Sequence, residues 1–600
     1  MRVADYIFKT LADMGIKHVF MVSGGGAMHL NDALGREKRI KYICNANEQG
    51  CAIAAEGYAR TSGDLSVINV TTGPGGTNAI TGVIGSWLDS LPVLIISGQV
   101  KFQTTIASAP DLDLRQLGDQ EINIIDIVKP ITKYAKMLTE VKDVRKELLK
   151  AVHLATSGRP GPVWLDIPLD IQASHVDIAD LDDFVIEEDV SKPDDFKINE
   201  TIESLLQAKR PVIIAGHGIR LSKAKDDFLK LVEKLKIPVV TTFNGFDLIE
   251  SSHPMFVGRI GTIGTRPGNF ALQSADLILS IGSRNNIRQV SYNWENFAPK
   301  AKKIVVDIDP DELKKKTLVP DIPINMDAKF FIKILLDSDI FKKLPSWEKW
   351  NEWNQIRKKR YPASLPEYKN VSAGIQPYYF TEILTSILDD DAIVCCTNAT
   401  PSITLFQAGI VKASQRMFAN SGCASMGFGL PAAIGAATAF PDRQIICLEG
   451  DGSLLMNIQE MQTSAHYNMP IKMFLFDNNE YCSIRQTHDS FFGGHHTGVN
   501  SNSGVSFPDW ECIAKAFGWG YVKITKHDTM KEQIEAVLST DKNILCDVVL
   551  CKNYIFQPKL SSKKLADGSM VSKPLEDMFP FLEREELESN IIREGETIED

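Results

Sequence analysis

IICLEGDGSLLMNIQEMQTSAHYNMPIKMFLFDNN, residues 445–479, is the stretch that decides the fold of this chain. Its first apolar run ends at Gly450 and predicts a buried strand, and the run IKMFLF (471–476) predicts a second one. The residues between them, 453–470, predict a helix. A strand–helix–strand unit of this kind belongs to an open α/β sheet, in which ligands bind at the carboxyl ends of the strands.

Polar groups follow both strands and are expected side by side at that edge of the sheet. Asp451 comes directly after the first strand, and Asn478 follows the second. A carboxylate and an amide oxygen, with no Cys or His adjacent, suit Mg²⁺, which takes oxygen ligands and leaves positions for phosphate and water. Gly-Asp-Gly alone is a common turn. The pairing with a strand-ending Asn predicts a metal site that can hold a diphosphate.

The composition is that of an ordinary globular protein and excludes several classes of function. The 600 residues carry a net charge of −11 and no basic tract with interleaved aromatic residues, so we expect no nucleic-acid partner. No apolar run is long enough to span a bilayer, and the N-terminus lacks a signal-peptide core, so we expect no membrane partner. The ten cysteines are scattered, which favours reduced thiols and a cytoplasmic location.

Three blocks of alternating strand and helix patterns, joined by less regular charged segments, predict an α/β protein. The second block contains the short apolar runs PVIIAGHG, PVVTTF, LILSIGS and KIVVDIDP, which predict a doubly wound parallel sheet. The acidic segment 177–195 is typical of a linker. The expected divisions are 1–172, 190–340 and 370–552 for the three α/β domains, and 553–600 for a polar C-terminal tail.

Three further segments carry a family resemblance. NSGCASMGFGLPAAIGAATAFPDRQIICLEGDGS (420–453), NANEQGCAIAAEGYAR (45–60) and TTGPGGTNAITGVIGSWLDSLPVLIISGQV (71–100) resemble thiamine diphosphate (ThDP)-dependent enzymes of the acetolactate (acetohydroxyacid) synthase group. The resemblance implies three doubly wound domains, namely a pyrimidine-binding, a central Rossmann-like and a diphosphate-binding domain. It also implies a homodimer or homotetramer in which Glu48 of one subunit faces Asp451 of another.

The resemblance also assigns roles to single residues. Asp451 and Asn478 would bind Mg²⁺ through their side chains, and Glu480 through its backbone carbonyl. Glu48 and Met426 would be catalytic, because Glu48 exchanges a proton with the aminopyrimidine ring and Met426 supports the bent form of the cofactor. The residues expected to contact the cofactor are Gly25, Glu48, Pro74, Asn78, Asn398, Ala399, Thr400, Ser425, Met426, Gly450, Asp451, Gly452, Ser453, Asn478, Glu480, Tyr481 and Cys482.

Two of these residues also have a plain structural interpretation. An acidic side chain such as Glu48 is favourable near the N-terminus of a helix, whatever its chemistry. Asn78 follows a Gly-rich turn, and we expect it to cap the next helix.

The expected substrate pocket differs from that of the amino-acid pathway enzymes. Its predicted walls are Asp119, Gln120, Ser483, Ile484 and Thr487. Acetolactate synthases of branched-chain amino-acid synthesis carry a Trp at the position of Thr487 and an aromatic residue at that of Asp119. Both differences predict a wider and more polar pocket, and so an acceptor such as a keto-sugar or another polar carbonyl compound.

The expected reaction is decarboxylation of a 2-keto acid, with pyruvate as donor, and transfer of the two-carbon acyl unit to a carbonyl acceptor. Two alternatives stay open, namely a 2-keto acid decarboxylase that does not ligate and a flavin-linked enzyme of the pyruvate oxidase type. The segment 257–291, with Arg284 and Arg288, resembles the region that holds FAD in some relatives. FAD therefore stays an open expectation beside ThDP and Mg²⁺.

Overall fold

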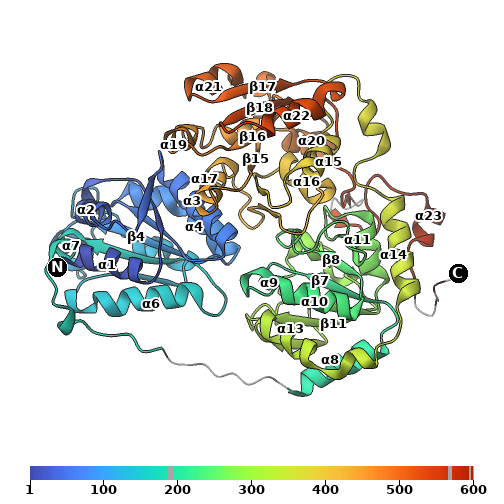
Figure 1. Cartoon of the computed structure of the whole chain (residues 1–600), viewed down its shortest axis with the longest axis horizontal. Helices are drawn as coiled ribbons and strands as arrows, with labels where there is room; N and C mark the ends of the chain where they lie inside the picture. The colour runs from blue at the N-terminus through green and yellow to red at the C-terminus, as the bar shows by residue number, and fades with distance from the viewer. Residues whose placement is uncertain (187–194, 565–569, 594–595, 597, 599–600) are drawn as a thin grey trace.

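The computed structural model describes residues 1–186, 195–564, 570–593, 596 and 598. Over these residues the chain forms three α/β bodies, each with a six-stranded parallel sheet between helices (Figure 1). The predicted α/β class and the three doubly wound sheets are confirmed. Part of the expected acidic linker lies outside the described residues.

The N-terminal body alternates helices and strands along its whole length. In chain order they are α1 (Val3–Asp13), β1 (His18–Met21), α2 (Met28–Arg36), β2 (Lys41–Cys44), α3 (Glu48–Ser62), β3 (Ser66–Val70), α4 (Pro74–Leu88), β4 (Val93–Gln99), α5 (Ile124–Val128), β5 (Tyr134–Met137), α6 (Val144–Thr156), β6 (Val163–Pro168) and α7 (Leu169–Ala173). The strands pair in the order β2-β1-β3-β4-β6-β5. β3, β4 and β6 are buried throughout, because helices cover both faces of the sheet.

The central body contains the four strands predicted from its apolar runs. In chain order its elements are α8 (Asp195–Gln207), β7 (Pro211–Ala215), α9 (Gly218–Leu221), α10 (Lys225–Leu235), β8 (Val239–Thr241), β9 (Phe256–Arg259), α11 (Arg266–Ser274), β10 (Leu277–Ile281), α12 (Ile287–Val290), β11 (Lys302–Asp307), β12 (Ile322–Asn325), α13 (Ala328–Asp337) and α14 (Glu348–Arg360). The sheet order is β12-β11-β10-β7-β8-β9. The chain adds strands on one side of β7 (β8, β9) and then on the other (β10 to β12), so the strand order reverses between β7 and β10. Sheets of this kind bind ligands at that point.

The C-terminal body repeats the topology of the N-terminal body. Its elements are α15 (Pro377–Ile387), β13 (Ile393–Cys396), α16 (Thr400–Ala408), β14 (Arg416–Ala419), α17 (Gly429–Ala439), β15 (Ile445–Gly450), α18 (Asp451–Leu454), α19 (Glu460–His466), β16 (Lys472–Asp477), α20 (Cys482–Phe491), α21 (Trp510–Ala516), β17 (Gly520–Ile524), α22 (Met530–Leu538) and β18 (Ile544–Val549). The sheet order is β14-β13-β15-β16-β18-β17. Numbered within each body, both sheets have the same strand order.

The region between β15 and β16 corrects one expectation. The two strands are confirmed and pair in parallel, but the helix predicted over 453–470 is two short helices, α18 and α19. Asn457, in the break between them, is buried and donates a hydrogen bond from Nδ2 to the backbone oxygen of Gly427 at 2.8 Å. Asparagine competes poorly for helix interiors because its side chain bonds to nearby backbone, and here that tertiary bond takes the place of a continuous helix.

The N-terminal and C-terminal bodies pack closely through α3 and α17. A Cβ atom at Gly57 of α3 would lie 2.3 Å from the backbone oxygen of Ala432, and one at Gly435 of α17 would lie 2.0 Å from that of Ala54. Glycine is therefore required at both crossing points, because any side chain would separate the two backbones. One hydrophobic core runs across this contact, so the bodies are firmly joined.

The described part of the segment expected to form a polar tail packs against the central body (Figure 1). This segment contains β19 (Ser562–Lys564), β20 (Met570–Ser572) and α23 (Arg584–Ser589). Asn269 of α11 donates to the backbone oxygen of Leu575 at 3.0 Å, and Tyr361 donates to Glu586 at 2.7 Å. The acidic residues near the C-terminus therefore have partners that the sequence pattern did not reveal.

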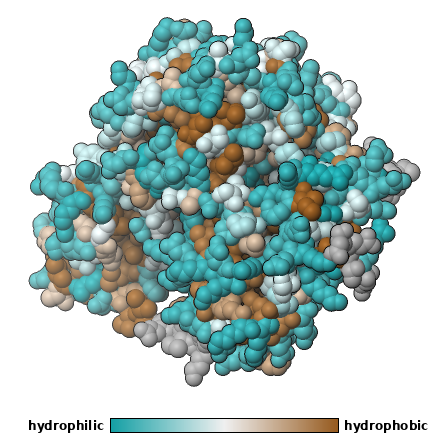
Figure 2. Space-filling model, turned by 45° about the vertical axis from the view of Figure 1, so that its right-hand side comes forward, coloured by the Kyte–Doolittle hydropathy of each residue, from teal (hydrophilic) through white to brown (hydrophobic). Residues whose placement is uncertain are grey.

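The surface seen in Figure 2 is mostly hydrophilic, with smaller hydrophobic patches. Large apolar side chains are nevertheless exposed at several places, among them a stretch with Leu112, Leu114 and Leu117 and another with Phe491 and Phe492. All ten cysteines are free. Within the described ranges, the helices are too short or too polar to cross a membrane.

Candidate active site

A cavity of about 380 Å³ lies at the carboxyl ends of β13, β15 and β16. Phe243 and Arg288 of the central body complete its lining, and no sequence motif pointed to Phe243. Most residues expected to contact the cofactor meet here, together with two of the expected substrate walls. The expected residues in the lining are Asn398, Ala399, Thr400, Met426, Gly450, Asp451, Gly452, Ser453, Asn478, Glu480, Tyr481, Cys482, Ser483 and Ile484.

The three positions expected as metal ligands form one loop junction. Asp451 Oδ2 accepts hydrogen bonds from the backbone N–H groups of Asn478 at 3.2 Å and Asn479 at 2.7 Å. The backbone N–H of Glu480 donates to Asn478 Oδ1 at 3.2 Å. The turn after β15 and the loop after β16 are thus joined by hydrogen bonds, which agrees with their expected positions at the ends of two neighbouring parallel strands.

Backbone strain is concentrated around this cavity. Ala399, Ala424 and Asn479 have φ angles of 56°, 54° and 55°, in the left-handed region that costs a non-glycine residue about 1–3 kcal/mol. A Cβ atom at Gly452 would lie 1.9 Å from Cε1 of Tyr481, so only glycine allows that ring to cover the turn. Strain held in place by packing is typical of a binding site.

The electrostatics of the junction favour a divalent cation. Asp451 is 4% exposed, and burial raises the pKa of its carboxyl group to about 7, with the nearby Asp477 adding to the increase. Burial, followed by the neighbouring Asp547, likewise raises the pKa of Asp477 to about 6. Among the described residues no cluster of three or more His, Cys, Asp or Glu offers another metal site. This oxygen donor set fits Mg²⁺, whose charge would stabilise both carboxylates.

Glu48 begins α3 in the N-terminal body and does not line the cavity. Its Oε2 accepts a hydrogen bond from Nδ2 of Asn78 at 3.1 Å. The expectation that Asn78 caps a helix is wrong, because Asn78 lies inside α4, whose N-cap is Gly73. The Asn78 side chain binds Glu48 instead of the helix N-terminus. The chain enters α4 through Gly73, whose φ of 59° suits glycine.

The other expected residues of the N-terminal body lie at the same sheet edge as this glutamate. Gly25 follows β1 and Pro74 follows β3. A Cβ atom at Gly73 would lie 2.3 Å from the backbone oxygen of Gln120, so the exposed residues Asp119 and Gln120 lie beside the same turn. None of the described residues of this body lines the cavity. One chain therefore holds the expected site as two separate halves.

Glu460 is the first residue of α19 in the C-terminal body, and its side chain contacts the segment before α3 in the N-terminal body. Its carboxylate accepts hydrogen bonds from Asn45 Nδ2 at 2.8 Å and from the N–H groups of Ala46 at 3.1 Å and Asn47 at 3.3 Å. A Cβ atom at Gly50 would lie 2.3 Å from its Oε1. The sequence did not point to Glu460, because a separation of 415 residues hides the contact.

Two expected residues lie next to the cavity without lining it. Thr487 is exposed on α20, and its hydroxyl donates to the backbone oxygen of Ser483 at 3.1 Å. Ser425 lies between Ala424 and Met426 of the lining. Its hydroxyl is buried and has no hydrogen-bond partner among the described residues, so it is available to a ligand.

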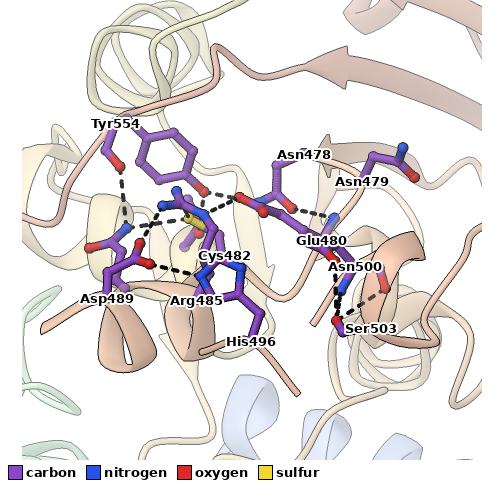
Figure 3. Close-up of polar contacts among 12 residues, drawn as sticks. Asn478, Asn479, Glu480, Cys482, Arg485, Asp489, His496, Asn500, Ser503 and Tyr554 are labelled. Carbon is purple, nitrogen blue, oxygen red and sulfur yellow. Dashed lines mark hydrogen bonds and ion pairs between the residues drawn. The ribbon is translucent and has the colours of Figure 1, made fainter. Parts of the chain in front are cut away.

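Ion pairs connect α20 to the loop of Glu480 (Figure 3). Arg485 contacts Glu480 at 2.6 Å and Asp489 at 2.9 Å, and Asp489 contacts His496 at 2.7 Å. The side chains of Arg485 and Glu480 are each 18% exposed, which strengthens their pairing relative to a surface pair. The expected substrate wall is thereby held against the expected metal loop.

A second cavity, of about 130 Å³, lies where the winding of the central sheet reverses. His217 follows β7, Asp307 ends β11, and both line it. Burial lowers the pKa of His217 well below its usual range, and neither ring nitrogen has a hydrogen-bond partner among the described residues. Phe243, Arg288 and Ser421 line both cavities, so the two are adjacent. Unpaired polar groups at this point of the sheet fit a nucleotide.

Comparison with known proteins agrees with this arrangement. Family models of thiamine pyrophosphate enzymes match the chain in three parts, the N-terminal TPP binding domain at 1–123, the central domain at 198–335 and the C-terminal TPP binding domain at 401–548. The chain is 32% identical to the probable acetolactate synthase large subunit of Methanocaldococcus jannaschii, over 92% of both chains. It is also 32% identical to the acetolactate synthase large subunit of Lactococcus lactis, over 92% of both chains. Identity to acetolactate synthase 1 of Zea mays is 33%, over 91% of this chain and 85% of the relative.

Proposed function

Since this chain belongs to the family of thiamine pyrophosphate enzymes, with acetolactate synthase large subunits among its relatives, we propose that it is a ThDP-dependent carboligase. Its reaction would be decarboxylation of pyruvate and transfer of the two-carbon acyl unit to a carbonyl acceptor. Bound ThDP supplies the electron sink for that chemistry. The observation that carries the proposal is the junction of Asp451 and Asn478 in the lining of the larger cavity.

The C-terminal body provides the binding groups in this proposal. The side chains of Asp451 and Asn478 and the backbone carbonyl of Glu480 would hold Mg²⁺ and, through it, the diphosphate. Met426, in the same lining, would support the bent cofactor. The free hydroxyl of Ser425 would donate to it. Together these groups bind and orient, and they carry no proton in the reaction.

The N-terminal body provides the proton-transferring group. Glu48, held by Asn78, would exchange a proton with the aminopyrimidine ring, which is the task of a positioned general acid and base. Because Glu48 does not line the cavity of its own chain, we propose a homodimer in which Glu48 of the partner subunit completes each site, alone or within a homotetramer. The apolar stretches 112–117 and 491–492, exposed in one chain, would be buried in such a contact.

Product analysis separates this proposal from its alternatives. Purified protein with pyruvate, alone and with a panel of aldehydes, ketones and nucleotide-linked keto-sugars, should give a ligated product by mass spectrometry. Free acetaldehyde as the main product would instead identify a decarboxylase without ligation. Acetate or acetyl phosphate, formed with consumption of an electron acceptor, would identify an enzyme of the oxidase type.

We propose a polar carbonyl compound as acceptor, because Thr487 and Asp119 replace two aromatic walls of the branched-chain enzymes. Each poorly filled gap of methylene size lowers selectivity for an aliphatic acceptor by about 1–3 kcal/mol. With pyruvate as donor, 2-ketobutyrate should therefore not be preferred over pyruvate as acceptor. A competition assay counts acetohydroxybutyrate against acetolactate, and strong enrichment of acetohydroxybutyrate would contradict the proposal.

The smaller cavity supports a second cofactor, for which we propose FAD. The unpartnered ring of His217 and the position at the reversal of the sheet suit a nucleotide. A flavin spectrum in the purified protein, and FAD among the compounds released by denaturation, are the expected results. Release of a nucleotide without flavin would contradict FAD while keeping a nucleotide site.

The remaining expectations from the sequence stay proposals. We keep the domain limits 1–172, 190–340 and 370–552 as proposals, which the positions of the three six-stranded sheets support; residue 190 lies outside the described residues. The free cysteines support a cytoplasmic location, which fractionation of the producing cells would test.

A further inference from the structure

The hydroxyl of Tyr554 joins the expected metal ligand to the expected diphosphate loop. Asn478 Nδ2 donates to it at 2.9 Å (Figure 3). The hydroxyl also lies 2.8 Å from Oγ1 of Thr400, the first residue of α16. Tyr554 is 6% exposed and follows β18, outside every motif that the sequence singled out. Its oxygen is therefore a buried link between two separate parts of the cavity lining.

The chemistry of the amide sets the direction of one of these hydrogen bonds. An amide nitrogen only donates, so the Tyr554 oxygen accepts from Asn478, whereas either hydroxyl can be the donor between Tyr554 and Thr400. Thr400 is also part of the cavity lining. On the other side of the amide, Asn478 Oδ1 faces the N–H of Glu480. A reversed amide would place two donors together there, so the contact with Glu480 selects the orientation in which Nδ2 faces Tyr554.

The wall helix α20 fixes the backbone that carries this phenol. Gln486 is buried on α20, and its Nε2 donates to the backbone oxygen of Tyr554 at 3.3 Å. Its Oε1 accepts from the N–H of Phe556, also at 3.3 Å. One glutamine thus fixes the backbone at Tyr554 and Phe556 against α20.

We propose that Tyr554 is a positioning residue of the cofactor site, whose hydroxyl turns the amide of Asn478 so that Oδ1 faces the metal and aligns the Thr400 hydroxyl with the diphosphate. This inference rests on the proposed function. Groups that orient metal ligands in this way typically contribute a factor of about 10–100 to metal affinity.

The test is Tyr554→Phe, which keeps the buried ring and removes the hydroxyl. The measurement is the Mg²⁺ concentration at half-maximal ThDP binding, followed by calorimetry or intrinsic fluorescence without substrate. We expect it to rise about 10–100-fold. Equal values for variant and wild type would overturn the inference. Failure of the wild-type chain to bind ThDP with Mg²⁺ would instead overturn the proposed function.

Tyr378→Phe is the matched control. Tyr378 is fully buried, and its hydroxyl also has two partners, Gln407 Oε1 at 2.7 Å and the N–H of Gln557 at 3.0 Å. The described contacts of Tyr378 include neither Asn478 nor Thr400. The Mg²⁺ dependence of ThDP binding by the Tyr378→Phe variant should therefore stay at the wild-type value. A similar shift in both variants would reduce Tyr554 to a packing role and contradict the proposal.

A double-mutant cycle tests the link through Thr400. Thr400→Val removes the second hydroxyl at constant shape, and Thr400→Ser keeps it. If Tyr554 acts through Thr400, Tyr554→Phe should weaken ThDP binding less in the valine background than in the wild type, while the serine variant behaves as wild type. Additive losses would show that Tyr554 and Thr400 act independently and would contradict this part of the proposal.

Discussion

At the scale of single residues, Asp451 is a buried carboxylate and Asp477 a half-buried one, and neither has an ion pair in the described structure. We expect Asp451→Ala to lose retention of ThDP at physiological Mg²⁺, because the cation that bridges to the diphosphate would lose its charged ligand. The measurement is the ThDP content after desalting, with and without a chelator. Tight binding by this variant that a chelator does not change would contradict the metal assignment.

Asp166 is a buried carboxyl group away from the cavity, and it predicts a pH dependence of stability. Burial raises its pKa to about 7, although Ser97 donates to it at 2.6 Å and Gln99 at 3.0 Å. The folded pKa lies above the unfolded value of about 3.9, so the folded chain binds a proton that the unfolded chain releases. Stability should therefore fall as the pH rises from about 4 to 7, by on the order of 4 kcal/mol at most.

Asp166→Asn provides the comparison for that prediction. The amide has nearly the same shape and does not titrate, so its unfolding midpoint should change less between pH 4 and 7 than that of the wild type. Chemical unfolding of the cofactor-free proteins over this range measures the difference. Parallel profiles for both proteins would show that Asp166 is not the group responsible.

At the scale of elements, the sequence predicted those strands and helices whose formation depends on the local residue pattern. β15, β16 and α3 were visible because apolar runs and helical spacing depend on neighbours along the chain. The break between α18 and α19 could not be predicted, because it depends on the hydrogen bond from Asn457 to Gly427 of another segment. For the same reason, no pattern pointed to Glu460 or Tyr554. Their partners are 415 and 76 residues away and become neighbours only after the sheets have formed.

The start of α3 should depend on Glu460. Glu460→Ala leaves the donors of Asn45, Ala46 and Asn47 without their acceptor, at about 1–3 kcal/mol for each one that stays buried. A displacement of Glu48 by about 1 Å can lower the rate by a factor on the order of 100. We therefore expect slower exchange of the C2 proton of bound ThDP, measured by NMR.

Glu460→Gln is the control for this element. The glutamine keeps one oxygen for the backbone donors, and the amide of Asn45, whose Oδ1 has no hydrogen-bond partner in the described structure, can turn to accept from it. Exchange should then stay much closer to the wild-type rate than in the alanine variant. Wild-type exchange in Glu460→Ala would show that the contact does not position Glu48.

At the scale of the whole molecule, the three bodies meet at a buried charge. Asp247 of the central body contacts Arg220 at 3.0 Å and Arg416 of the C-terminal body at 2.6 Å. Arg416 Nε in turn donates to the backbone oxygen of Arg60 in the N-terminal body at 3.0 Å. Asp247→Ala should cost about 3–5 kcal/mol, because it leaves a buried guanidinium without a counter-charge.

Asp227→Ala is the matched control, since the pair of Asp227 with Lys230 is largely exposed. Loss of such a surface pair changes stability by about 0–1 kcal/mol. The midpoints of chemical unfolding of both variants measure the difference. Similar midpoints would mean that the junction of the three bodies does not depend on Asp247.

Because no described residue of the N-terminal body lines the cavity, two inactive variants should restore each other when mixed. Chains with Glu48→Gln keep an intact cavity, and chains with Asp451→Ala keep an intact glutamate. In a mixed dimer, one site would combine the two intact halves and the other would combine the two damaged ones. Activity that appears only after subunit exchange would demonstrate such complementation. A mixture that stays inactive would mean that each chain builds its site alone.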